Sequence, residues 1–456
     1  MKLVLLSGGS GKRLWPLSND SRSKQFLKVL TDPQGMAESM VQRVWRQLGA
    51  AGLSRDSHIA TSKAQVEVMQ SQLGYETPLI VEPERRDTFP AIALAATYLY
   101  SVQGVGLQET IAVLPVDPYV EEAFFHKVKQ LDDVLHESGA DLALIGVTPT
   151  YPSEKYGYII PTAEGAAGTT SYRRVSRFTE KPREADAVRL IEEGALWNCG
   201  VFAFKLDYII NMLIALELPI QYDEMAKQYM KLPKISFDYQ VVEKAGHIAV
   251  SPYDGTWRDL GTWNTLTDEM EHKVLGRGIV SEDCENTHLI NELDIPVTIL
   301  GLSNVVVATS PDGILVSEKA SSPRIKEVLN GIDSRPMFEE RRWGHYRVID
   351  FLKLADGNEV LTKRICIKAG RNLSYQYHEK RDEVWTIVSG KGELILNDVR
   401  SEVAAGDVVK IARGTRHSIL ASEDLEIIEV QTGSELVEED IIRLSVGWNE
   451  IIEKCM

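Results

Sequence analysis

The sequence predicts an N-terminal α/β domain with a mostly parallel sheet, followed by two smaller units built from β-strands. Up to about residue 270, short apolar runs with strand propensity alternate with segments of helical apolar spacing. The runs at 2–6 and 110–114 both end in turn-forming or polar residues, which is where ligands bind in sheets of this kind. Beyond residue 277, β-branched runs separated by turns replace the helical pattern.

Length and composition limit the class of protein. At 456 residues the chain is too long for one ordinary core, so we expect two or three domains. Its 44% hydrophobic and 25% charged residues are typical of a soluble globular protein. No apolar run approaches the roughly 20 residues that span a bilayer, and the N-terminus lacks a signal-peptide pattern. We therefore expect a cytoplasmic protein.

Charge and cysteine content narrow the possible partners. The formal net charge of -16 disfavours nucleic acid and membrane surfaces, because their phosphates would be repelled. An anionic small substrate must then be held by a local basic site. The cysteines include no C-x-x-C pair, so they predict neither a disulfide framework nor a zinc ribbon. They are Cys199, Cys284, Cys366 and Cys455.

A glycine-rich turn follows the first strand, and it contains Gly8, Gly9, Ser10 and Gly11. Without Cβ atoms such a turn lets a polyphosphate approach backbone N–H groups, while nearby cationic side chains bind the phosphate oxygens. No Ser or Thr follows Lys12, so the turn is not that of a P-loop ATPase, and it lacks the G-x-G-x-x-G spacing of dinucleotide sites. The residues alone leave open a tight turn without a ligand.

Read through to Leu27, the segment GGSGKRLWPL and the following SKQFL resemble the N-terminal signature of sugar-1-phosphate nucleotidylyltransferases, most closely the mannose-1-phosphate guanylyltransferases. The resemblance implies a Rossmann-like nucleotidyltransferase domain. It also implies that the triphosphate is held by Gly8, Gly9, Gly11, Arg13 and Lys24. Two positions depart from the family pattern, Ser7 for Ala and Ser23 for Pro.

Three further segments match the nucleotide and metal motifs of the same family. RDTFPAI resembles the R-N-T-A-P-A-I segment beside the nucleotide base, which implies roles for Arg86 and Thr88. Asp117 follows a strand and TWRDLGTW contains Asp259, and the resemblance implies that these carboxylates share Mg²⁺. Asp117 alone could equally be a helix-capping or turn aspartate. Pro118 stands where the family has His.

Sugar recognition is indicated by three matches farther along the chain. YGYI places Gly157 where the sugar ring approaches backbone, FTEKP supplies Glu180 and Lys181, and WNCGVF supplies Asn198. The resemblance implies that Lys181 neutralises the sugar phosphate, that Glu180 accepts hydrogen bonds from sugar hydroxyls and that Asn198 is a sugar ligand. Glu154 and Lys155 add bulk where the family has Thr and Gly, which could alter recognition of the sugar.

The chain after the transferase motifs divides into two predicted units. Our expected boundaries are 1–274 for the nucleotidylyltransferase domain, 275–335 for a small β unit and 336–456 for a C-terminal domain. Short β-branched runs with Ser-Pro pairs favour a β unit over a linker at 275–335. In the family this region is a β-helix-like extension.

The C-terminal domain carries the spacing of the two cupin motifs, which predicts a jelly-roll barrel. Four side chains could converge there on a divalent metal, Zn²⁺ or another, namely Gln376, His378, Glu383 and His417. Ordinary core or surface histidines are the alternative. QYHEKRDEVW also resembles the Q-x-H-x-x-R-x-E-H-W motif of type II phosphomannose isomerases, which are fused to guanylyltransferases of this length.

The isomerase resemblance is incomplete. Val384 replaces the second His of the motif, and RLSVGWNE keeps Arg443 but lacks the Asp, Tyr and final Arg of R-x-x-D-x-Y-G-R. Isomerisation needs a proton-transfer group and phosphate-binding groups, so part of the equipment is missing.

The leading hypothesis is a nucleotidylyltransferase that joins GTP and mannose 1-phosphate into GDP-mannose and pyrophosphate. Another sugar 1-phosphate or nucleotide, a bifunctional enzyme that also interconverts mannose 6-phosphate and fructose 6-phosphate, and a non-catalytic cupin remain alternatives. We expect a homodimer or larger homo-oligomer.

Overall fold

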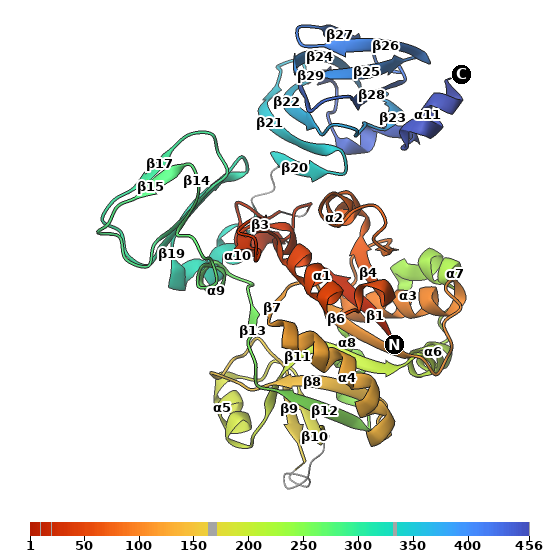
Figure 1. Ribbon diagram of the computed structural model, residues 1–456, viewed down its shortest axis with the longest axis vertical. Coiled ribbons are helices and arrows are strands. Elements are labelled where there is room, and N and C mark those ends of the chain that lie inside the picture. The colour runs from red at the N-terminus through yellow and green to blue at the C-terminus, as the bar shows by residue number, and fades with distance from the viewer. Residues whose placement is uncertain (10, 20, 163–170, 332–334, 456) are drawn as a thin grey trace.

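A computed structural model describes residues 1–9, 11–19, 21–162, 171–331 and 335–455. Ser10 of the glycine-rich turn lies outside these residues. The N-terminal domain lies at the bottom of Figure 1, the C-terminal domain at the top and the small β unit to one side.

A nine-stranded sheet forms the centre of the N-terminal domain, in the order β5-β4-β1-β6-β11-β8-β12-β10-β9. Strands β1, β4, β5 and β6 pair in parallel, as do β8 and β12, whereas β10 and β11 run antiparallel to their neighbours. The predicted mostly parallel arrangement therefore describes the first half, and the whole sheet is mixed. The bounds are β1 (Lys2–Ser7), β4 (Ser57–Ser62), β5 (Leu79–Glu82), β6 (Thr110–Pro115), β8 (Leu142–Val147), β9 (Tyr158–Pro161), β10 (Arg173–Thr179), β11 (Leu196–Lys205) and β12 (Ile248–Tyr253).

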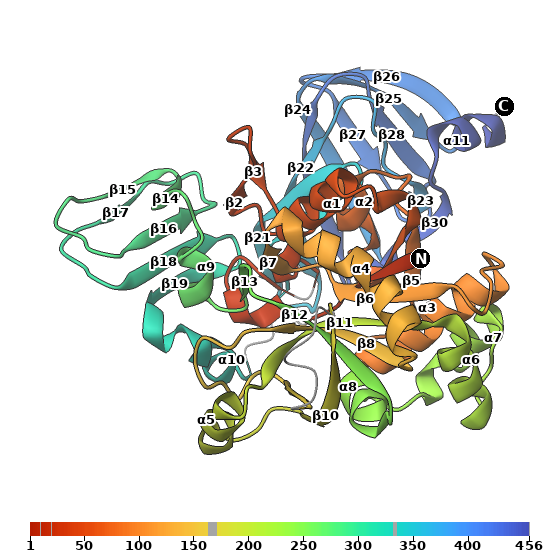
Figure 2. The same ribbon diagram turned by 60° about the horizontal axis from the view of Figure 1, so that its bottom comes forward.

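Helices cover both faces of this sheet (Figures 1 and 2). Buried residues of α1, α2 and α4 join one core cluster with one face, and those of α3, α6, α7 and α8 join a second cluster with the other. The helices of this domain are α1 (Met40–Ala50), α2 (Val66–Leu73), α3 (Thr88–Ser101), α4 (Glu122–Ser138), α5 (Glu184–Glu192), α6 (Leu206–Ala215), α7 (Tyr222–Gln228), α8 (Phe237–Gln240) and α9 (Trp263–Thr267). Helix α1 begins at Met40, because Ser39 caps it in a capping box with Gln42.

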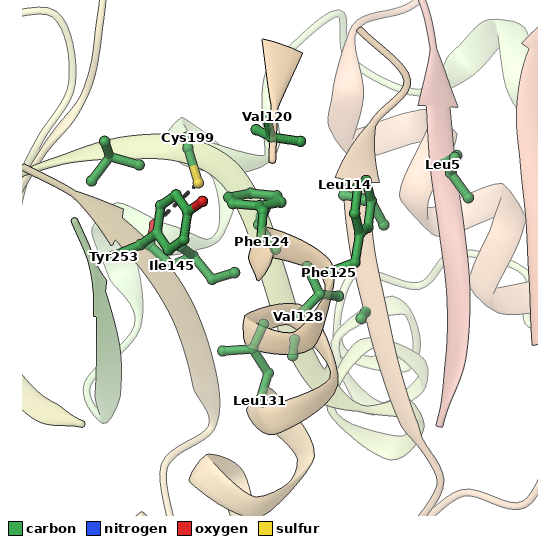
Figure 3. Packing of buried hydrophobic residues seen from close by; sticks show 14 of the residues in the cluster. Leu5, Leu114, Val120, Phe124, Phe125, Val128, Leu131, Ile145, Cys199 and Tyr253 are labelled. Atoms are coloured by element: carbon green, nitrogen blue, oxygen red, sulfur yellow. Dashed lines mark hydrogen bonds between the residues drawn. The ribbon is translucent and has the colours of Figure 1, made fainter. Parts of the chain in front are cut away.

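Figure 3 shows how α4 closes the first core cluster. Phe124, Phe125, Val128 and Leu131 lie on one side of the helix and are fully buried. Phe124 meets the ring of Tyr253 edge to face at 5.2 Å. The helix thus fixes the strands whose carboxyl ends carry the site.

Two short strand pairs lie outside the nine-stranded sheet. The pair β2 (Leu30–Thr31) and β3 (Ala37–Glu38) is a small hairpin, and β7 (Pro118–Val120) pairs antiparallel with β13 (Trp257–Asp259).

The small β unit contains two parallel ladders. In one, β14 (Val274–Gly276), β16 (His288–Asn291) and β18 (Val305–Ser310) pair in parallel, and β19 (Gly313–Glu318) adds antiparallel. In the other, β15 (Gly278–Val280) pairs in parallel with β17 (Val297–Ile299). A short helix, α10 (Ile325–Val328), follows. The β-helix-like description stays a prediction.

The C-terminal domain consists of two antiparallel sheets packed face to face, in the manner of a jelly roll. One has the order β20-β21-β22-β29-β24-β27 and the other β26-β25-β28-β23-β30. The bounds are β20 (Phe338–Arg341), β21 (Gly344–Lys353), β22 (Glu359–Ile367), β23 (Tyr375–Tyr377), β24 (Arg381–Ser389), β25 (Lys391–Leu396), β26 (Val399–Ala404), β27 (Val408–Ile411), β28 (His417–Ala421), β29 (Leu425–Gly433), β30 (Ile442–Ser445) and α11 (Trp448–Lys454).

Among the described residues, no helix has both the length and the apolar character needed to cross a membrane.

Replacing Phe124 by Ala should destabilise the N-terminal domain by about 3–5 kcal/mol, because it leaves a cavity under the sheet. Guanidinium titration of the full chain measures the change in the free energy of unfolding. The matched control is Ile214→Ala on α6, a side chain 55% exposed, which should cost about 0.5 kcal/mol or less. Equal losses in the two variants would contradict the packing described for α4.

Candidate functional site

The glycine-rich turn opens a cavity at the carboxyl end of β1. Gly8 and Gly9 are exposed there, and Gly9 has φ +122°, a conformation that side-chain-bearing residues rarely adopt. The cavity has a volume of about 570 Å³. Its wall also includes Asp117, Arg86 and Thr88. The turn therefore presents backbone to a ligand-sized space.

Lys24 joins two carboxylates at the edge of this cavity. Its Nζ lies 2.8 Å from Asp117 Oδ2 and 2.8 Å from Asp259 Oδ1. Burial opposes the charge of this ammonium, but the two carboxylates more than offset that effect and raise the pKa of Lys24. Three segments far apart in the sequence thus meet at one cation.

The backbone explains why the two carboxylates converge. Asp117 follows the buried strand β6, and Asp259 ends β13, where it pairs directly with Pro118 of β7. Pro118 begins that short strand, so the departure from His does not prevent the pairing. Burial acts to raise the pKa of Asp259, but the positive charges of Lys24 and Arg13 lower it by a larger amount. The pKa of Asp259 therefore lies below its ordinary value. Two carboxylates around one position are a ligand set that fits a divalent cation together with substrate phosphates.

Arg86 and Thr88 lie at the cavity wall, but their side chains are engaged within the protein. Arg86 donates to the carbonyl of Leu232 at 2.6 Å, and Thr88 Oγ1 accepts from the backbone N–H of Phe237 at 2.8 Å. Contact with a nucleotide base stays a prediction for both residues.

The predicted sugar residues gather around the end of β9. A Cβ on Gly157 would lie 2.4 Å from Glu180 Oε2, so only glycine permits this approach. Glu180 Oε1 pairs with Lys181 Nζ at 2.7 Å, and Glu180 Oε2 is buried without a hydrogen-bond partner among the described residues. Asn198 is tied to this region through its backbone, since its N–H donates to the Gly157 carbonyl at 2.8 Å. The four residues form one polar cluster.

Asp238 belongs to the same cluster, although it is not among the residues selected from the sequence. Asn198 Nδ2 donates to Asp238 Oδ1 at 2.6 Å, and Asp238 lines the cavity of the glycine-rich turn. Burial and the neighbouring Glu180 raise the pKa of Asp238 to about 6. The segment ISFDYQVVEKA could have identified Asp238, because it resembles the I-S-x-D-Y-x-x-x-E-K motif of the same transferases, which has Asp at this position.

Ser7 and Ser23, the two residues that depart from the family's phosphate motif, are linked by a buried polar network. Gln25 Nε2 donates to Ser7 Oγ at 3.1 Å, and the Gln65 amide is hydrogen-bonded to Ser23 Oγ. Ser23 Oγ also donates to the Gly9 carbonyl at 3.3 Å. These side chains therefore brace the turn from below.

The C-terminal domain brings together a second group of ligand-type side chains. His378 Nε2 lies 3.2 Å from Glu383 Oε1, and His417 Nε2 lies 3.7 Å from Glu383 Oε2. All three residues are buried, and their ligand atoms lie within 4.8 Å of one another. His417 Nε2 is buried without a hydrogen-bond partner among the described residues. The group has the composition of a divalent metal site.

Neighbouring groups set the charge state of these ligands. Each histidine ring is oriented through Nδ1, which faces the Asp440 carbonyl at 3.1 Å in His378 and the Thr415 carbonyl at 2.9 Å in His417. Burial lowers the pKa of His378 to about 4, so its ring is neutral at pH 7. Burial raises the pKa of Glu383, but the two histidines and Arg381 lower it to about 2. Neutral imidazoles and an ionised carboxylate are the forms that bind metal.

Gln376 does not complete this group in the structure. Its Oε1 accepts from Ser374 Oγ at 2.6 Å, although the residue pairs with His417 across β23 and β28. The role of Gln376 as a ligand stays a prediction.

The cavity beside this cluster has a volume of only about 60 Å³. A side chain of the N-terminal domain, Glu67 of α2, forms part of its wall. Glu67 lies 3.7 Å from Arg341 and 3.8 Å from Arg443. The arginine that survives from the isomerase motif therefore pairs with the other domain.

Comparison with known proteins agrees with the division of the chain into an N-terminal and a C-terminal domain. A model of the nucleotidyl transferase family matches residues 2–274, and a model of the mannose-6-phosphate isomerase C-terminal domain matches residues 335–446. The chain is 33% identical over 476 residues to the xanthan biosynthesis protein XanB of Xanthomonas campestris pv. campestris, covering 96% of this chain and 97% of that protein. It is 30% identical over 488 residues to the alginate biosynthesis protein AlgA of Pseudomonas aeruginosa, covering 99% and 98% of the two chains.

Two further proteins are similar. The mannose-1-phosphate guanylyltransferase RfbM of Salmonella typhimurium is 28% identical over 477 residues, with 97% of this chain and 96% of that protein covered. A crystal structure described as a mannose-1-phosphate geranyltransferase from Thermus thermophilus superposes with a TM-score of 0.60 at 28% identity, covering 72% of this chain and 98% of the other.

The chain belongs to the nucleotidyl transferase family, and it is a nucleotidyltransferase enzyme. More particularly, it is a member whose transferase domain continues into a mannose-6-phosphate isomerase C-terminal domain, because its relatives match it through both parts.

Asp238→Asn should raise the thermal midpoint at pH 8 by roughly 2–4 °C and raise it by less than half as much at pH 4.5. A carboxyl whose pKa is raised to about 6 contributes stability below its unfolded pKa, and that contribution is lost as the pH rises through about 6. The amide keeps the bond from Asn198 without the charge. Scanning calorimetry at both pH values measures the difference, with exposed Asp254→Asn as control. The same gap between wild type and Asp238→Asn at both pH values would contradict the raised pKa.

Proposed function

We propose that the N-terminal domain transfers the guanylyl group of GTP to mannose 1-phosphate, giving GDP-mannose and pyrophosphate. The observation that carries the proposal is the convergence of Asp117 and Asp259 on one cation position beside the glycine-rich turn. Full-length similarity to a mannose-1-phosphate guanylyltransferase supports the choice of substrates.

The residues act by positioning and by offsetting charge. A phosphate oxygen of mannose 1-phosphate attacks the α-phosphorus in line, the bond from that phosphorus to the bridging β-phosphate oxygen breaks, and pyrophosphate leaves with the electron pair. Backbone N–H groups of Gly8, Gly9 and Gly11 hold the triphosphate, and Arg13 and Lys24 bind its oxygens.

Asp117 and Asp259 would hold Mg²⁺, which supplies charge neutralisation on the reacting phosphates. In the structure Lys24 is the cation between them, so we infer that its ammonium turns from the carboxylates to the phosphates when nucleotide and metal bind. One lysine then serves both states.

The acceptor site is the polar cluster around Gly157. Lys181 is 52% exposed at its side chain, so its ammonium can turn from Glu180 toward a phosphate. Glu180 is 6% exposed and suited to accept from sugar hydroxyls. Asn198 and Asp238 complete the wall. Arg86 and Thr88 contribute to the base side of the cavity.

The finer organisation follows the same proposal. We assign the transferase domain to 1–274, a short β-helix-like unit to 275–335 and the cupin domain to 336–456. We expect a cytoplasmic homodimer or larger homo-oligomer, with no nucleic-acid or membrane partner.

The test of the proposed function is pyrophosphate release across a matrix of nucleoside triphosphates and sugar 1-phosphates. GTP with mannose 1-phosphate should give the highest kcat/KM, and both Asp117→Ala and Asp259→Ala should lower it by at least about 10³-fold, because charge stabilisation supplies most of this catalysis. Asp254→Ala, an exposed carboxylate five residues before Asp259, should retain activity. Near-normal turnover in both site variants would contradict the roles of these carboxylates.

His378, Glu383 and His417 have the composition of a metal site, which suggests isomerase activity as a second function of the chain. Val384 and the altered C-terminal motif argue against full isomerase equipment. We propose that the cupin binds a divalent ion, Zn²⁺ or another, but isomerises mannose 6-phosphate weakly or not at all.

A coupled fructose 6-phosphate assay with the metal supplied tests this second point. Wild type should give little turnover, while metal analysis should find one bound ion that His417→Ala loses. The control is His345→Ala, a histidine of the same domain outside the cluster. Robust turnover that disappears in His378→Ala would establish a bifunctional enzyme and overturn our proposal.

A further inference from the structure

Strand β20 of the cupin packs against helix α2 of the transferase domain, as Figure 1 shows. The contact uses none of the metal-type ligands and is not needed to complete either barrel sheet. Polar side chains make this contact, and their directional hydrogen bonds fix how the strand and the helix pack together.

Glu340 is the centre of this contact. One carboxylate oxygen accepts from Ser71 Oγ at 2.7 Å and lies 3.6 Å from Lys28 Nζ, and the other accepts from Gln72 Nε2 at 3.1 Å. The side chain is only 15% exposed. All three partners belong to the transferase domain.

Gln72 carries this contact onward to the phosphate-binding segment. Its Nε2 also donates to the carbonyl of Phe26 at 3.0 Å, and its Oε1 accepts from Ser39 Oγ at 2.6 Å. Phe26 ends the single helical turn Lys24–Phe26, so the carbonyl held by Gln72 belongs to the turn that begins with Lys24. One amide therefore connects the cupin carboxylate to the turn that carries the predicted phosphate-binding lysine.

The hydrogen-bonding capacity of Gln72 explains why Glu340 determines the orientation of the Gln72 amide. The Gln72 amide has two N–H bonds, one used on Phe26 and one on Glu340, and its oxygen is used on Ser39. Removing the carboxylate leaves one N–H of this partly buried amide without its protein acceptor and releases Lys28. We therefore expect the amide to rotate away from Phe26.

We propose that Glu340 of the cupin is a positioning residue for nucleotidyl transfer, which holds the Lys24 turn in place through Gln72. The inference rests on the proposed function. It gives the cupin a task that needs no isomerase chemistry. The pairs that Glu67 makes with Arg341 and Arg443 fasten the same helix to the same domain, so α2 is held at two points.

The test compares full-length Glu340→Ala with wild type in steady-state kinetics. We expect KM for GTP to rise about fivefold or more, with KM for mannose 1-phosphate and the thermal midpoint nearly unchanged. Glu340→Gln should recover part of the loss because its amide oxygen can accept from Gln72. Gln72→Ala should raise KM for GTP similarly, and the double variant should be no worse than the worse single variant.

The matched control is Glu435→Ala, which removes an exposed cupin carboxylate paired with Lys380 of the same domain. It should leave both KM values unchanged. An unchanged KM for GTP in Glu340→Ala overturns the inference, and so does a rise in both KM values together with a lower thermal midpoint, which is the signature of a structural role alone. Calorimetric titration with GTP compares the affinities of the same variants for GTP without turnover. If GTP and mannose 1-phosphate gave no product, that result would contradict the proposed function but not this inference.

Discussion

The ion pairs of Lys24 with Asp117 and Asp259 are the interaction on which the rest of the structure depends. They bring together a turn after the first strand, the end of β6 and the end of β13, at a separation of up to 235 residues. Because these groups are partly buried, leaving any one of them unpaired would cost more than an exposed ion pair is worth. The sheet, the helix α4 and the short β7–β13 ladder all serve to hold these groups in one place.

The small β unit and the cupin domain also contact the segment that carries Lys24. Leu14, Leu17 and Leu27, which flank the phosphate motif, share a core cluster with Ile290 and Val306 of the small β unit. On another side, the cupin reaches the Lys24 turn through Glu340 and Gln72. The phosphate-binding segment is thus packed by all three units of the chain, which gives a physical reason for them to occur as one polypeptide.

Sequence reasoning grouped the candidate site residues through their resemblance to family motifs, and the roles of those residues stay predictions. It predicted that Asp117 and Asp259 would lie at one position, and the structure brings them within 2.8 Å of the same nitrogen. It could not foresee the reversed direction of β10 and β11, since strand propensity carries no information on direction. Arg443 was read only against an isomerase motif, and its pairing with Glu67 depends on domain packing that no local pattern encodes.

The most direct measurement is a crystal structure with Mn²⁺ and a non-hydrolysable GTP analogue, in which anomalous scattering locates the metal. The account predicts one peak about 2.0–2.3 Å from an oxygen of both Asp117 and Asp259, with Lys24 Nζ turned to the phosphates. A peak elsewhere, with Lys24 still between the two carboxylates in the complex, would contradict it.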